Sequence, residues 1–101
     1  MNFLPAALVV GQAGAPVLPV GSHTIGVRPE HAALAGDGPL HLTVTQVEQL
    51  GASSVLRGNV GADTPFELVC NGQTALRPGD TVALALPAPH LHCFDAHGQR
   101  L

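Results

Sequence analysis

Residues 90–97 have the highest density of side chains that could do chemistry. The segment reads His-Leu-His-Cys-Phe-Asp-Ala-His and contains imidazole, thiol and carboxylate groups, which are the ligands that zinc prefers. On a strand, however, His90 and His92 would share one face while Cys93 points to the other. The spacing therefore does not bring three ligands to one ion without a sharp bend. We interpret the segment as a solvent-facing strand and assign no metal ligand.

Residues for nucleophilic or acid–base catalysis show no productive arrangement either. No serine or cysteine sits in a glycine-flanked elbow of the kind that exposes a nucleophile. The seven acidic residues are scattered singly, so no catalytic carboxylate pair is located. The four basic residues are all arginine, whereas a phosphate-binding P-loop requires a lysine. We therefore assign no catalytic or cofactor-binding residue and predict that this chain is not itself an enzyme.

Composition limits the partners and the compartment. A net charge of −3 lacks the positive patch that nucleic acid needs, and without Trp or Tyr few rings are left for base stacking. No apolar run is long enough to cross a bilayer, and residues 1–11 lack the basic start of a secretory signal. We expect a cytoplasmic chain without a nucleic-acid partner. Cys70 and Cys93 are expected to be free thiols, because isolated cysteines outside an extracellular context seldom pair.

The elements that position these residues are predicted to be short β-strands. Twelve glycines and nine prolines interrupt the chain before any helical period lasts three turns. Apolar residues instead alternate with polar ones, as they do on half-buried strands. The alternating faces are Ile25 and Val27, Leu40 to Val44, Phe66 to Cys70, and Val82 to Leu86.

One irregularity is expected within the second of these strands. The apolar register switches from even to odd positions between Val44 and Val47, which is the effect of one extra residue in a strand. This predicts a bulge near Thr45 and Gln46. Strands with bulges coil sharply, and small barrels need that coiling to close.

Glycine and proline mark the connections between the strands. A compact turn is expected at residues 51–54, a loop at 36–38, and hairpin turns at 71–72 (Asn-Gly) and 78–79 (Pro-Gly). Only residues 29–35 could hold a helical turn, because proline is favoured at a first helical position. Five to seven short antiparallel strands with at most a short helical turn predict an all-β fold, a small OB-like barrel or a sandwich.

Several short motifs occur in order along nearly the whole chain. They are Met1–Ala6, Gly26–His31 (G-V-R-P-E-H), Val47–Gly51, Pro78–Asp80, Leu91–Asp95 and Gly98–Leu101. Together they resemble the C-terminal transport-associated OB (TOBE) domain of importer ATPases for maltose, glycerol 3-phosphate and similar solutes. On this resemblance the family-motif residues, expected to be regulatory, are Gly26, Arg28, Pro29, Glu30, Glu48, Gly51, Gly79, Asp80, Phe94, Asp95 and Gly98.

The resemblance implies that residues 1–101 are a single OB-like domain of a longer ABC importer subunit. It implies a non-catalytic domain that regulates the subunit and helps two copies pair during uptake of carbohydrate or glycerol 3-phosphate. The implied partners are a second copy of the ATP-binding subunit, membrane permease subunits and, in some members, a regulatory protein. No cofactor is expected in this chain, since ATP and magnesium would bind the parent's other domain at the inner face of the plasma membrane.

Two other classes of function stay open. Related molybdate-binding domains share this fold type and hold oxyanions with backbone N–H groups and short polar side chains, for which Gly51, Ser53 and Ser54 are candidates. Oxyanion binding would protect the fold against heat, because a ligand stabilises only the state that binds it. A His-rich metal-binding module on residues 90–97 is the second alternative, which a zinc titration would test.

Overall fold

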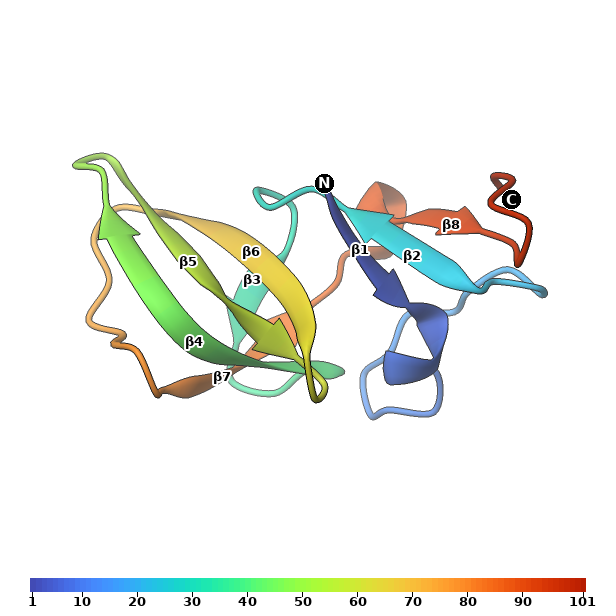
Figure 1. The fold of residues 1–101 in the computed structure, drawn as a ribbon, viewed down its shortest axis with the longest axis horizontal. Helices are drawn as coiled ribbons and strands as arrows, with labels where there is room; N and C mark the ends of the chain where they lie inside the picture. Colours follow the sequence, from blue (N-terminus) through green and yellow to red (C-terminus); the bar gives the residue numbers. More distant parts are fainter.

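Two antiparallel β-sheets lie end to end along the molecule (Figure 1). The computed structural model describes all residues, Met1–Leu101, and measures 39 × 22 × 21 Å along its principal axes. Each of its two 3₁₀ helices has three residues, and neither is long and apolar enough to cross a membrane. The elements in order are β1 (Asn2–Pro5), η1 (Ala6–Leu8), β2 (Thr24–Val27), β3 (Ala33–Ala35), β4 (Leu40–Gln49), β5 (Ser53–Val60), β6 (Thr64–Asn71), β7 (Thr81–Ala85), η2 (Ala88–His90) and β8 (His92–Phe94).

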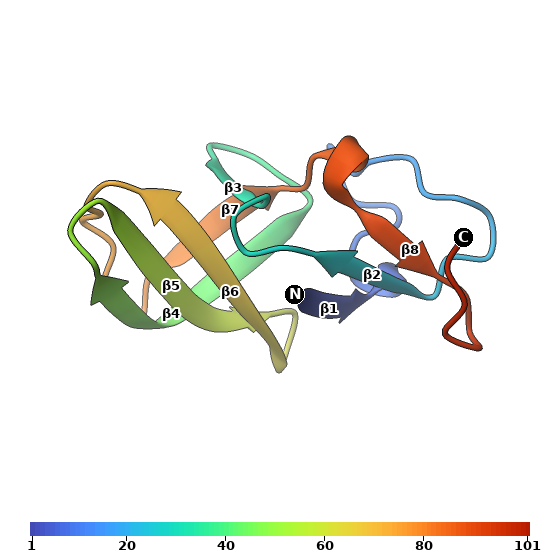
Figure 2. The ribbon, with the colours of Figure 1, turned by 90° about the horizontal axis from the view of Figure 1, so that it is seen from above.

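β4, the longest strand, lies at the centre of the larger sheet, whose order is β3-β7-β4-β5-β6 (Figure 2). Leu40, Leu42 and Val44 are buried and the residues between them are exposed, so one face of the sheet packs on the core. The pairing of β4 with β5 shifts register between Val44 and Gln46, which confirms the predicted bulge. The extra residue bends β4, and the sheet curls into the half-barrel expected of an OB-like fold.

The smaller sheet has the order β1-β2-β8, and β1 lies beside β6 of the larger sheet. Leu4, Ile25 and Cys93 face inward from its three strands and are almost fully buried. Fifteen buried apolar residues from both sheets and the segments between the strands form one hydrophobic core. The all-β prediction is therefore confirmed. The structure has eight strands where five to seven were expected, because β3 and β8 have only three residues each and are too short to show an alternation.

The segment after β2 differs from the predicted helical turn over residues 29–35. The chain makes one tight turn, in which the His31 N–H donates to the Arg28 carbonyl at 3.0 Å, and then forms β3. β3 pairs with β7, so its backbone groups bond to another strand. A helix of this length is unstable unless packing supports it, and here the strand pairing replaces it.

The connection from β6 to β7 also differs from the prediction. Residues 71–72 and 78–79 do form turns, with Gly72 at φ 75° and Gly79 at φ 98°. They are not hairpins, however, because β7 lies between β3 and β4 and does not pair with β6. Turn residues predict where a chain reverses but not which strand it then meets. The turn after β4 is a true hairpin, closed by the Leu50 N–H donating to the Ser53 carbonyl at 2.8 Å.

Candidate functional site

The motif Gly26–His31 forms the end of β2 and the turn that follows it. Arg28 and Glu30 are exposed, and neither takes part in an ion pair. The Pro29 carbonyl accepts a hydrogen bond of 3.0 Å from the Val69 N–H on β6. The turn therefore ties the smaller sheet to the outer edge of the larger one and leaves the two charged side chains free for contact with solvent or a partner.

Gly26 is needed because other side chains cross β2 at this point. A Cβ atom on Gly26 would lie 2.7 Å from the Met1 sulfur and 3.1 Å from the Phe3 ring. The Phe3 ring also packs against Phe94 on β8, with ring centroids 6.1 Å apart. Phe3 is 57% exposed. The missing side chain of Gly26 thus lets an aromatic pair form across the outer face of the smaller sheet.

Gly79 and Asp80 hold the bulge of β4. The Gly79 N–H donates to the Val44 carbonyl at 2.7 Å, and the Val44 N–H donates to the Asp80 carbonyl at 2.8 Å. The Asp80 carboxylate accepts a further bond of 2.9 Å from the Arg77 N–H. These contacts close the turn before β7, so the two motif residues act here on the backbone of the sheet.

Gly51, Asp95 and Gly98 lie in turns at opposite ends of the molecule. Gly51 is in the β4–β5 hairpin, while Asp95 and Gly98 are in the turn after β8. The Asp95 carboxylate accepts bonds of 2.9 Å from the N–H groups of His97 and Gln99. The motif residues therefore lie at separate places and are not brought together in one pocket.

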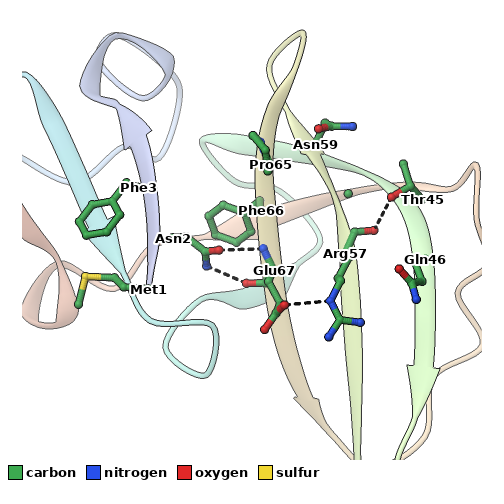
Figure 3. A pocket seen from close by; sticks show the side chains of 11 residues that line it. Met1, Asn2, Phe3, Thr45, Gln46, Arg57, Asn59, Pro65, Phe66 and Glu67 are labelled. Atoms are coloured by element: carbon green, nitrogen blue, oxygen red, sulfur yellow. Dashed lines mark hydrogen bonds and ion pairs between the residues drawn. The ribbon is translucent and has the colours of Figure 1, made fainter.

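A groove of about 610 Å³ opens between β1 and the outer face of β4, β5 and β6 (Figure 3). Arg57 crosses it from β5. Its Nε atom lies 3.0 Å from the Glu67 carboxylate, and its Nη1 atom lies 3.2 Å from the carboxylate of Glu48, a motif residue on β4. The Arg57 guanidinium donates hydrogen bonds to the carboxylates of Glu48 and Glu67, and these bonds, first that to Glu48, raise its pKa. Three strands are thus joined by one partly exposed cation.

Asn2 joins the two sheets at the edge of the same groove. Its Nδ2 group donates to the Glu67 carbonyl at 2.7 Å, and its Oδ1 atom accepts from the Glu67 N–H at 2.9 Å, as Figure 3 shows. The Asn2 side chain is buried, and both of its polar groups are satisfied. Apolar Met1 and Phe3 line one wall of the groove. The other wall has polar side chains, among them Arg57 and Glu67, that are fixed by hydrogen bonds. Such an arrangement can bind another protein surface.

A family model described as the TOBE domain matches residues 25–94 of the chain. The chain belongs to the TOBE domain family. The match covers both sheets from β2 to β8 and confirms the resemblance carried by the ordered motifs.

Known relatives of this TOBE domain include three proteins named sn-glycerol-3-phosphate import ATP-binding protein UgpC. The one from Chromohalobacter salexigens is 37% identical over 120 residues, which cover all of this chain and 32% of the relative. The one from Ruegeria pomeroyi is 36% identical over 111 residues, which cover all of this chain and 32% of the relative. The one from Burkholderia thailandensis is 40% identical over 101 residues, which cover 96% of this chain and 27% of the relative. The chain spans about a third of the length of these relatives.

Sequence reasoning missed three residues of the TOBE groove, namely Asn2, Arg57 and Glu67. Arg57 and Glu67 stand between buried residues of their strands, so their outward direction could have been predicted from alternation. Their pairing could not, because they are opposite each other only in the register that the β5–β6 hairpin sets. Nothing in the sequence indicates the contact of Asn2 with a residue 65 positions away.

The structure bears directly on the two alternative sites. Ser54 is buried, and its hydroxyl lies 2.6 Å from the Gly72 carbonyl and 2.7 Å from the Gln49 Oε1 atom, so its single proton is already engaged. The TOBE domain gathers no three His, Cys, Asp or Glu side chains into a group that could hold a metal ion. Cys70 and Cys93 are both free, and burial raises the pKa of the Cys70 thiol.

Proposed function

We propose that this chain is the non-catalytic accessory domain of an ABC importer ATP-binding subunit that serves uptake of glycerol 3-phosphate or a related solute. The observation that carries the proposal is the similarity of the whole chain to about a third of three such subunits, together with the TOBE match. ATP and magnesium would bind the rest of the subunit. The domain would work at the cytoplasmic face of the membrane, where the parent meets its permease subunits.

The role within the subunit is regulation and pairing of two copies. Two features of the structure support this role. The groove is open and has both apolar and hydrogen-bonding walls, which suits contact with a protein surface. The Arg57 ion pairs and the Asn2 hydrogen bonds join β1, β4, β5 and β6, so this surface is rigid and would lose little conformational freedom on binding.

The size of the native protein tests the first part of this proposal. Antiserum raised against the chain is used to probe a lysate of the source organism. We expect a single band about three times heavier than 10.3 kDa, in the proportion that the relatives show. A band at 10.3 kDa itself would overturn the assignment to an importer subunit.

A blocked groove tests the second part. Asn59 is half-buried, lines the groove and makes no side-chain hydrogen bond, so Asn59→Arg in the native-length protein fills the groove without breaking an internal contact. We expect a several-fold loss of glycerol 3-phosphate uptake with unchanged ATP binding. Thr81→Arg, which adds the same charge at an exposed site on β7, is the matched control. Normal uptake by Asn59→Arg would show that the groove is not the contact surface.

A further inference from the structure

The outer face of the β1-β2-β8 sheet is both aromatic and basic. Ile25 and Val27 point into the core, so Gly26 and, directly after the strand, Arg28 lie on the outer face. On β8 Cys93 is buried, so its neighbours His92 and Phe94 likewise lie on the outer face. The register aligns these positions across the sheet, because Phe3 is opposite Gly26, and Gly26 is opposite His92.

Five basic side chains gather at this face and next to it. His31 stacks on His90, with ring centroids 4.0 Å apart and an interplanar angle of 27°. His92 on β8 is half-buried and lies opposite Gly26, and Arg100 forms a bridge with Phe94 of the same strand. The pKa of His92 is lowered, first by burial and then by the positive charges of Arg100, Arg28, His31 and His90. The members of the cluster are Arg28, His31, His90, His92 and Arg100.

Carboxylates do not balance this cluster. Both ion pairs of the structure belong to Arg57, so Arg28 and Arg100 have no acidic partner. Glu30 lies in the same turn as Arg28 but is exposed and makes no ion pair. The Asp95 carboxylate is occupied by the backbone N–H groups of its own turn. A chain of net charge −3 therefore has one face with unneutralised positive charge.

Apolar groups lie directly beside these charges. Phe3 is 57% and Met1 50% exposed, and Phe94 packs on Phe3. We name the surface made by Phe3, Arg28, His92, Phe94 and Arg100 the basic face. Phenylalanine, methionine and arginine are all enriched in protein interfaces relative to the rest of the surface.

We propose that the basic face docks an acidic segment of another protein, one that carries aspartate or glutamate beside an aromatic or aliphatic residue. The carboxylates would meet Arg28, Arg100 and the histidines, and the apolar side chain would lie on Phe3 and Phe94. The proposal goes beyond the function proposed above, because it assigns a partner chemistry to a face that shares only Phe3 with the groove.

Charge and shape favour this occupant over smaller ligands. A metal ion is repelled by the two arginines, and the histidines do not form a three-ligand group. A free anion would gain nothing from the exposed rings. A peptide segment uses both parts of the face, and like-charge repulsion among the basic groups is relieved when its carboxylates bind.

Fluorescence anisotropy tests the proposal on the native-length protein. The probe is a short labelled peptide of Asp, Glu, Leu and Phe, and its control is the same peptide with Asn and Gln in place of the acids. We expect the acidic peptide to bind, with weaker binding at high salt because the contact is between exposed charges. The double variant Arg28→Glu and Arg100→Glu should lose at least tenfold in affinity.

Four further measurements can overturn the proposal. Arg77→Glu changes an exposed arginine away from this face and should leave the affinity unchanged. Phe3→Ser should weaken the acidic peptide several-fold, and an unchanged affinity would exclude the apolar part of the contact. Displacement of the peptide by millimolar inorganic phosphate would indicate a small-anion site instead. Tighter binding to phosphatidylserine vesicles than to the peptide would indicate a membrane surface.

Discussion

The side chain of Asn2 connects the two sheets through hydrogen bonds to the backbone of Glu67, and its removal should destabilise the domain. Asn2→Ala removes two hydrogen bonds and leaves both backbone groups of Glu67 without these partners. We expect the free energy of unfolding to fall by about 2 kcal/mol, the typical cost of leaving buried polar groups unsatisfied. Urea titration followed by circular dichroism measures the change.

An aspartate at the same position distinguishes the donor from the acceptor. Asn2→Asp keeps an oxygen for the Glu67 N–H but places a negative charge beside the Glu67 carbonyl. It should be destabilising at neutral pH and less so in acid, where the carboxyl group regains a proton that it can donate. Equal stability of Asn2→Asp at both pH values would contradict the assigned hydrogen bonds.

His92 should make the domain sensitive to mild acid. Its folded-state pKa lies below 6.5, so the unfolded chain binds the proton first as the pH falls. The free energy of unfolding therefore decreases as the pH drops from the unfolded pKa of His92 towards its folded pKa. The stability associated with neutral His92 is fully present only above the unfolded pKa. His92→Gln should flatten the dependence of the urea midpoint on pH between about 7 and about 5. His41→Gln, an exposed histidine on β4, is the control.

At the scale of elements, the bulge depends on the close approach of β4 and β5. A Cβ atom on Gly58 would overlap the Thr43 carbonyl oxygen, which is backbone and cannot move aside as a side chain would. Gly58→Ala should destabilise the domain by about 1–3 kcal/mol, as overpacking does. Gly36→Ala is the matched control, since nothing lies within 4 Å of its Cβ position. Equal thermal midpoints for the two variants would contradict this packing.

The elements also show how far sequence patterns reach. The bulge near Thr45 and Gln46 was predictable, because burial forces a change of alternation when one residue is added. The path of β7 was not, since the same turn residues would suit a hairpin with β6 or a crossover to β4. Most of the strand faces could be predicted, but the Arg57 and Asn2 contacts could not, because they depend on which strands become neighbours.

At the scale of the whole molecule, the shared core predicts one cooperative unfolding transition. Ile25 belongs to the smaller sheet and Leu42 to the larger one, and both side chains are fully buried. Ile25→Ala and Leu42→Ala should each lower the free energy of unfolding by about 2–5 kcal/mol. Amide signals from both sheets should disappear at one urea midpoint in each variant. Separate midpoints for the two sheets would show two independent units.

The contacts along the outer side of β6 have one more consequence. The N–H and C=O of Glu67 bond to Asn2, and the N–H of Val69 bonds to Pro29, so groups that an additional strand would use are already occupied. Exposed sheet edges recruit strands from other molecules and lead to aggregation. At the opposite side of the sheet, β3 has only three residues. Growth of an intermolecular sheet is thus opposed at both edges of the larger sheet, which protects it from edge-to-edge aggregation.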